Sequence, residues 1–172
     1  SRQELRYVPQ LDGGQPGEYL TDRLTDEAIQ IIRTSTDKPF FLNMCYYTVY
    51  TPIEGKPELT KKYTALLKDG QRHSNAHYAA MVQSLDENVG RLLTELKQQN
   101  ILDQTVVILT SDNGGFINKF RGNTVTNNAP LRSGKGSLYE GGIRVPLLIR
   151  WPHVTTPNSV SHEPVTTCDF YP

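Results

Sequence analysis

The sequence predicts an α/β layered fold with a substantially parallel sheet. Two apolar segments of strand length, "FFLNMCYY" (40–47) and "TVVIL" (105–109), each follow a segment with helical spacing, and a third, "VPLLIRWP" (145–152), follows a long polar loop. Helices that alternate with apolar strands are typical of layered α/β domains. With 172 residues, we expect the whole chain to be part of one domain, cut at both ends.

The first half of the chain begins with an irregular stretch. Residues 1–17 contain "LDGGQPG" and show no period, which indicates a surface lead-in. From Tyr19 onward, apolar residues recur at helical spacing and predict a helix. A turn at Asp37-Lys38-Pro39 then leads into residues 40–47, which we interpret as a buried strand.

The second half contains the strongest helical pattern. A short helix is predicted over 58–68 and a longer one over about 75–99, before a strand over 105–112, a polar loop over 113–140 and the last strand. The long helix carries an apolar stripe, interpreted as core, with its charged residues mostly outside it. The stripe consists of Tyr78, Met81, Val82, Leu85, Val89, Leu92, Leu93 and Leu96.

Composition excludes several classes of function. Eighteen basic residues balance eighteen acidic ones, so the net charge gives no footprint for nucleic acid or an anionic membrane surface. No apolar run approaches the ~20 residues of a membrane helix. Cys45 and Cys168 lack the spacing of a zinc site, and both a disulfide and two free thiols remain open for them.

Asp112 and Asn113 are the first candidate site residues. They follow an apolar strand, where ligands of open α/β sheets gather. A carboxylate beside an amide carbonyl offers two hard oxygens, which suit Ca²⁺ or Mg²⁺, and Gly114 and Gly115 leave room for a ligand. The alternative interpretation is an Asx-turn that only caps the strand.

Lys135 is the second candidate, because it lies between two glycines in "RSGKGSLYEGGIRVP". Because glycine has no side chain, the ammonium group of Lys135 could contact a bound anion without obstruction from its neighbours. A phosphate-binding P-loop is excluded, since Ala129 and Gly136 occupy positions where that motif needs Gly and Ser or Thr. A flexible loop with a solvated lysine remains the alternative. A third segment, "YYTVYTPIEGKP", contains aromatic residues that by themselves indicate packing.

Read jointly, these segments resemble the sulfatase family of the alkaline-phosphatase-like superfamily. The similarity rests on "SLDENVGRLLTELKQQNILDQTVVILTSDNGG", "LRSGKGSLYEGGIRVPLLIRWP" and "SHEPVTTCDFYP", and extends over about residues 19–172. The resemblance implies an alkaline-phosphatase-like layered fold with a mostly parallel central sheet flanked by helices. It also implies that the protein is a sulfuric ester hydrolase that cleaves a sulfate ester with the help of a metal.

The resemblance assigns roles to individual residues. Asp112 and Asn113 become ligands of one divalent cation, Ca²⁺ with Mg²⁺ possible, and Lys135 becomes a catalytic and sulfate-binding residue. The family's nucleophile is a formylglycine made within a C-x-P-S-R type motif, which neither Cys45 nor Cys168 fits. We therefore expect the nucleophile and two further metal acids in an N-terminal part outside this chain, and no turnover by the chain alone.

Tyr50 departs from the family pattern. Relatives carry His immediately before this "TP", where it contacts the sulfate, so the resemblance assigns substrate binding to Tyr50. A phenol can donate a hydrogen bond to a sulfate oxygen. It cannot carry the positive charge of an imidazolium, because its pKa is about 10 against about 6.5 for His. His73 and His77 are nearby candidates to replace that charge, or plain surface residues.

Two other functions stay open. One is a phosphomonoesterase or phosphodiesterase of the same superfamily with two zinc ions, although Asn113 is a poor zinc ligand. The other is a non-catalytic pseudo-sulfatase, suggested by Tyr50. The substrate is open between a sulfated small molecule and a sulfated carbohydrate, and Lys119 and Arg121 suit a polyanionic sugar as well as a solvated loop. Export to the periplasm, the cell exterior or the lysosome is implied by the resemblance alone.

Overall fold

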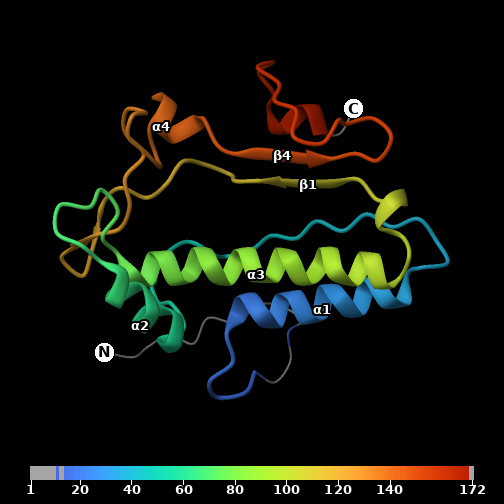
Figure 1. Ribbon diagram of the computed structural model, residues 1–172, viewed down its shortest axis with the longest axis horizontal. Helices are drawn as coiled ribbons and strands as arrows, with labels where there is room; N and C mark the ends of the chain where they lie inside the picture. Colours follow the sequence, from blue (N-terminus) through green and yellow to red (C-terminus); the bar gives the residue numbers. More distant parts are fainter. Residues whose placement is uncertain (1–10, 12–13, 171–172) are drawn as a thin grey trace.

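The computed structural model describes Leu11 and residues 14–170 (Figure 1). Helices form one layer, and a pair of strands lies on the other side of the longest helix. The predicted lead-in lies largely outside the described residues, and its described end, 14–17, contains a turn. The helices and strands are α1 (Leu20–Thr34), α2 (Pro57–Leu66), α3 (Ala76–Gln98), η1 (Leu102–Gln104), β1 (Val107–Thr110), β2 (Lys119–Phe120), β3 (Asn123–Thr124), α4 (Glu140–Ile143), β4 (Leu147–Arg150) and η2 (Thr167–Phe170).

The three predicted helices are confirmed, and their ends have local causes. Asn75 caps α3, because its side-chain oxygen accepts a hydrogen bond from the backbone N–H of Tyr78 at 3.0 Å. Pro57 begins α2, where its missing N–H costs nothing. Among the described residues, no helix combines the length and the apolar character needed to cross a membrane.

The packing of α3 differs from the predicted apolar stripe. Met81 and Leu96 are buried, but Val82 is 44% exposed. Small and polar residues of α3 are the most buried instead, namely Ala80, Ser84 and Asn88. Asn88 donates a hydrogen bond to Asp22 of α1 at 2.7 Å, so polar groups contribute directly to the contact between the two helices.

Glu95 is a charged residue that the sequence placed outside the core, and the structure buries it. Its side chain is 4% exposed and accepts two hydrogen bonds of 2.8 Å from Arg33 of α1. Gln99 donates a third at 2.7 Å. These donors lower the pKa of the Glu95 carboxyl group below its ordinary value, with Arg33 as the main cause. A bidentate charge-assisted pair thus holds α1 against α3.

We expect this ion pair to make stability depend on pH. Because the folded protein lowers the pKa of Glu95, the stabilisation is present above the ordinary carboxyl pKa and is lost as the pH falls through the lowered value. In urea unfolding between about pH 7 and pH 3, Glu95→Gln should lose less stability than wild type. Asp86→Asn on the same helix should lose as much stability as wild type over this pH range. An equal pH dependence in wild type and Glu95→Gln would contradict the assignment.

The predicted parallel sheet is not found among the described residues. β1 pairs with β4 in antiparallel register, from Val107 opposite Arg150 to Thr110 opposite Leu147, and β2 pairs antiparallel with β3. The route of the chain explains the difference. A parallel pair needs a crossover that returns to the same end of the sheet. The connection from β1 to β4 contains only short elements and reverses direction, so β4 runs back along β1.

Residues 40–47, predicted as a buried strand, form no strand in the structure. Their side chains alternate between exposed and half-buried, as in a strand, but they pair with no strand of the described chain. Side chains tie them to α1 instead: the hydroxyl groups of Tyr46 and Thr25 lie 2.7 Å apart. Phe41 is 88% exposed. The predicted buried strand is therefore not formed in the described part of the chain, because a strand needs a neighbouring strand to pair with.

A small apolar core lies beneath the loops at one end of α3. Ile53, Met81 and Val125 are buried together there. Val49, Tyr78, Phe116 and Phe120 pack against them. This core joins the segment after residue 47, helix α3 and the polar loop after β1, so three segments far apart in the sequence are fixed relative to one another.

Candidate functional site

Asp112 and Asn113 lie just beyond the end of β1, separated from Thr110 by Ser111, as expected for residues at a strand end. Asp112 is exposed and Asn113 is half-buried. The turn is held by its neighbours, since the Ser111 hydroxyl donates to the backbone carbonyl of Asn113 at 2.9 Å and the Thr110 hydroxyl donates to that of Pro146 at 3.0 Å. Neither the carboxylate of Asp112 nor the side-chain amide of Asn113 has a hydrogen bond or ion pair to the described part of the chain.

The structure does not contain the Asx-turn at Asp112 that was the alternative interpretation. An Asx-turn needs the Asp112 carboxylate to accept the backbone N–H of Gly114. That N–H donates to the carbonyl of Gly142 instead, at 2.8 Å. The carboxylate oxygens therefore remain available to another ligand, and the strand end is bound to the segment around α4.

Lys135 lies on a loop that is in contact with the segment after Asn113. Its backbone N–H donates to the carbonyl of Gly115 at 3.1 Å. Its ammonium nitrogen lies 3.8 Å from the centre of the Tyr50 ring, a cation–π distance. Among the described residues, no carboxylate lies within ion-pair distance of this ammonium group.

Tyr50 connects all three predicted segments. Its ring packs edge-to-face against Phe116, with centroids 5.8 Å apart and planes at 76°. The other neighbour of the ring is Lys135, and 43% of Tyr50 remains exposed. The structure thus brings together Tyr50, Lys135 and the loop after Asn113, which the sequence analysis had linked through motifs alone. Phe116, on which this arrangement depends, was not singled out.

Among the described residues, no hydrogen bond joins His73 or His77 to Tyr50 or Lys135. The Nδ1 atom of His77 accepts a hydrogen bond from the backbone N–H of Gly55 at 3.4 Å, and the Thr60 hydroxyl lies 3.5 Å from the same atom. His73 is exposed and forms no hydrogen bond to a described residue. Cys45 and Cys168 are both free and exposed, which leaves no disulfide between them.

The donors at the strand end fit a hard divalent cation as part of a ligand set. One carboxylate and one amide carbonyl are oxygen donors of the kind that Ca²⁺ takes, in sets of six to eight. Over residues 14–170, no group of three or more His, Cys, Asp or Glu side chains could hold a metal ion by itself. By residue type, Asp112 and Asn113 could supply two oxygen ligands of such a set, and among the described residues no cluster of acidic side chains supplies the others.

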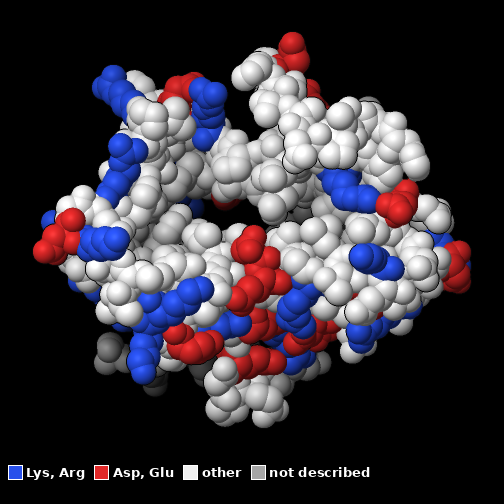
Figure 2. Space-filling view, in the orientation of Figure 1, with Lys and Arg blue, Asp and Glu red and all other residues white. Residues whose placement is uncertain are grey.

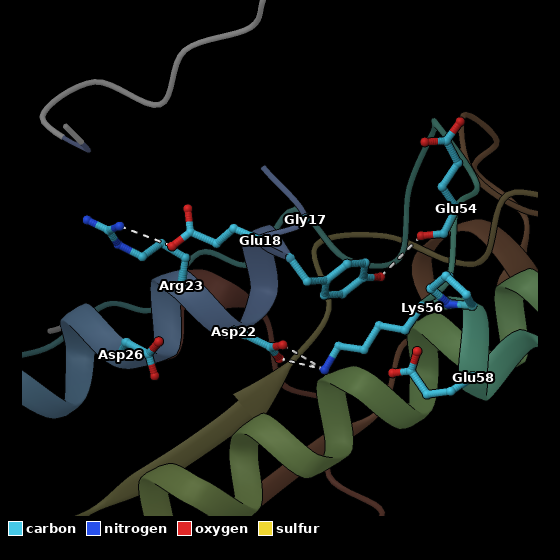
Figure 3. Close-up of a pocket in the computed structure, with 11 residues that line it drawn as sticks. Gly17, Glu18, Asp22, Arg23, Asp26, Glu54, Lys56 and Glu58 are labelled. Carbon is cyan, nitrogen blue, oxygen red and sulfur yellow. Dashed lines mark hydrogen bonds and ion pairs between the residues drawn. The ribbon is translucent and has the colours of Figure 1, made fainter. Parts of the chain in front are cut away.

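A pocket of about 540 Å³ lies elsewhere, between the start of α1 and the loop before α2 (Figure 3). Asp22 and Lys56 form an ion pair of 2.7 Å within it, and Asn88 also donates to Asp22. Burial raises the pKa of Tyr19, which lies beside this pair, and the Asp22 charge adds to the effect. None of the four predicted site residues lines the pocket, so we assign its ion pair to the packing of α1.

Comparison with known proteins identifies the family. The family model described as Sulfatase matches residues 2–172. A protein named Sulfatase from Formosa agariphila is 43% identical over 175 residues, covering 95% of this chain and 30% of the relative. The chain belongs to the sulfatase family. Rat steryl-sulfatase is 35% identical over 163 residues, covering 92% of this chain and 26% of the relative.

Solved sulfatase structures agree with the fold of this sulfatase chain. A structure described as Ps i-CgsB in complex with k-i-k-neocarrahexaose matches with a TM-score of 0.68 and 38% identity, covering 79% of this chain and 29% of the other. A putative sulfatase from Bacteroides fragilis matches with a TM-score of 0.60 and 26% identity, over 78% and 31%. This sulfatase chain spans less than a third of the length of each of these relatives.

We expect the contact between the strand end and α4 to tolerate no side chain at Gly114. A Cβ atom there would lie 1.7 Å from the carbonyl oxygen of Gly141. Gly114→Ala should therefore cost about 2–3 kcal/mol in denaturant unfolding, the upper range for overpacking. Gly90→Ala is the control: a Cβ on Gly90 meets nothing within 4 Å, so better helix propensity should stabilise by up to about 1 kcal/mol. Unchanged stability in Gly114→Ala would disprove this contact.

Proposed function

We propose that this chain is part of a sulfuric ester hydrolase, in which Lys135 and Tyr50 bind the sulfate and Asp112 and Asn113 bind one divalent cation. The observation that carries the proposal is the setting of Lys135. Its ammonium group lies on an aromatic ring and forms no ion pair with a carboxylate among the described residues, and its backbone N–H is hydrogen-bonded to Gly115, two residues beyond Asn113. A cation in such a setting is available to an external anion.

The chemistry of the site residues follows from where charge develops. Cleavage of a sulfate ester increases negative charge on the leaving oxygen and on the non-bridging oxygens, and fixed positive charges stabilise it. In this proposal Lys135 stabilises the departing oxygen. Tyr50 donates a hydrogen bond from its hydroxyl to a sulfate oxygen, and its ring keeps the ammonium group in place through the cation–π contact.

The strand end supplies the metal ligands in this proposal. Asp112 contributes a carboxylate and Asn113 a neutral carbonyl, both suited to Ca²⁺, with Mg²⁺ as the alternative ion. When bound, the cation supplies positive charge that neutralises charge on the sulfate. The Asp112 carboxylate has no partner among the described residues that would have to be displaced first.

The nucleophile is proposed to lie outside this chain. Cys45 and Cys168 do not have the C-x-P-S-R surroundings of a formylglycine precursor, and the ligand set at Asp112 is incomplete. A formylglycine and two further acids would come from the part of the complete protein that precedes this chain. The isolated chain is then expected to be inactive. Export from the cytoplasm also rests on the resemblance to the family.

The charge distribution favours a sulfated carbohydrate with several negative charges over a sulfated small molecule with a single one. Between Asn113 and Arg144 the chain has five basic residues and one acidic residue, although the whole chain is neutral. Figure 2 shows Lys and Arg side chains gathered over the side where these loops lie. A locally positive surface concentrates a substrate with several negative charges. A similar solved protein was found in complex with k-i-k-neocarrahexaose.

The direct test compares sulfate and phosphate ester hydrolysis by the complete protein. We expect hydrolysis of p-nitrophenyl sulfate that exceeds hydrolysis of p-nitrophenyl phosphate. The reverse preference would indicate a phosphoesterase of the same superfamily. Hydrolysis of neither ester, nor of a sulfated oligosaccharide, would support the non-catalytic alternative that Tyr50 in place of His raises.

Lys135→Ala should lower kcat by about 10²–10³, the scale for losing one group that stabilises developing charge. Lys119→Ala is the matched control, because Lys119 is an exposed lysine of the same basic loop region. It should change kcat little and raise KM only for a polyanionic substrate. Equal kcat values in Lys135→Ala and wild type would remove Lys135 from the catalytic residues.

Asp112→Asn should weaken Ca²⁺ binding to the complete protein by about ten-fold or more, because it removes a charged oxygen ligand. Calorimetric titration of the metal-free protein with Ca²⁺ measures this directly and needs no turnover. Asp69→Asn removes the same charge from an exposed turn and should leave the affinity unchanged. Wild-type affinity in Asp112→Asn would rule out this ligand.

A further inference from the structure

The position of Lys135 is set by contacts between backbones. Its N–H bonds to the carbonyl of Gly115 at 3.1 Å, and the N–H of Gly141 bonds to the carbonyl of Arg132 at 2.8 Å. A Cβ on Gly134 would lie 2.5 Å from the Gly115 oxygen. Two chain segments therefore touch without side chains between them. Such a contact needs another group to hold the segments together, because glycine itself contributes no packing.

The side-chain amide of Asn128 lies where these segments meet. Its Nδ2 atom is 3.0 Å from the carbonyl oxygen of Gly115, 3.1 Å from that of Ser133 and 3.0 Å from that of Gly141. The first belongs to the segment after Asn113, the second to the loop before Lys135, and the third to α4. An amide has two hydrogens to donate, so three carbonyls share them. One side chain thus binds all three segments.

The backbone around Asn128 is held by a hydrogen bond and by the nearby apolar core. Its backbone carbonyl accepts the N–H of Leu131 at 3.0 Å. Val125, three residues earlier, is part of the buried core. The neighbouring Asn127 makes a different contact: its side-chain oxygen accepts the N–H of Ala129 at 2.7 Å. The backbone at Asn128 is therefore anchored on both sides, and Asn127, whose side chain bonds only within the loop, offers a natural comparison.

We propose that Asn128 is a positioning residue for Lys135, whose side-chain amide fastens the loop of Lys135 to the segment after Asp112 and Asn113. The inference rests on the proposed function, because it acts through the catalytic role of Lys135. Asn128 lies against backbone carbonyls and has no contact with Tyr50 or Lys135 side chains among its hydrogen bonds. A displacement of a charged group by about 1 Å can lower a rate by about 10²-fold. Loss of the Asn128 hydrogen bonds should therefore lower kcat.

The proposal is tested by a double-mutant cycle in the complete protein with p-nitrophenyl sulfate. Asn128→Ala removes the amide, and Asn128→Asp replaces its donors with acceptors that repel the three carbonyls. Both should lower kcat by about ten- to a hundred-fold. Asn127→Asp keeps its acceptor for Ala129 and adds the same charge one residue away, and it should retain wild-type kcat.

The decisive readout is Asn128→Ala combined with Lys135→Ala. If Asn128 acts through Lys135, the double variant should have the kcat of Lys135→Ala alone. A general loss of folded protein would instead lower kcat by the same factor in both backgrounds, and that result would overturn the proposal. Should Asn128→Ala fail to fold, Asn128→Ser, which keeps one hydrogen to donate, takes its place in the cycle.

Hydrogen exchange separates this proposal from the proposed function. In Asn128→Asp, amides of residues 131–142 should exchange faster, whereas those of α3 should keep their wild-type rates. Unchanged exchange at 131–142 would disprove the fastening. If wild type cleaves no sulfate ester, the proposed function and the role of Asn128 in catalysis both fail, but the exchange measurement still shows whether the amide holds the loop.

Discussion

The site depends on one constraint: two loops must approach until their backbones touch. The bonds from Gly114 to Gly142 and from Lys135 to Gly115 exist only because no Cβ atoms stand between the chains. The segment that carries Asp112 and Asn113 and the loop that carries Lys135 are thereby joined through their backbones. Backbone contact, rather than side-chain packing, sets how closely these two segments approach.

The helical layer gives this contact its support. Arg33 and Glu95 hold α1 against α3, and Asp22 with Asn88 adds a second polar link. Near the start of α3, Met81 belongs to the core against which Phe116, the aromatic neighbour of Tyr50, packs. Helix α3 therefore connects its polar contacts with α1, which involve Asn88 and Glu95, to the apolar core near Lys135, which contains Met81.

The sequence was sufficient for features that depend on local pattern. Helical periodicity placed α1, α2 and α3 closely, and the motif "SDNGG" after an apolar strand placed Asp112 at a strand end. Features set by distant partners were missed. Glu95 resembles any surface acid until Arg33, 62 residues away, is brought against it. Asn128 binds carbonyl groups, which every residue has, so no residue type in the sequence indicates its partners.

Strand direction was missed for a similar reason. The apolar pattern of residues 145–152 predicts a strand, but its direction depends on the path of the connecting loop. That path is fixed by Gly141 and Gly142 in contact with Arg132 and Gly114, which is tertiary information. Residues 40–47 were predicted as a buried strand from their apolar side chains, but they are exposed or half-buried and pair with no strand among the described residues.

The neighbour of Lys135 has a consequence for how an anion would arrive. An internal carboxylate would form an ion pair that every incoming sulfate had to break, at the cost of separating two opposite charges. The Tyr50 ring is uncharged, and the ammonium group rests on its face. If Lys135 binds an anion as proposed, that anion displaces no carboxylate of the described residues, and the attraction of the ring can persist while the new ion pair forms.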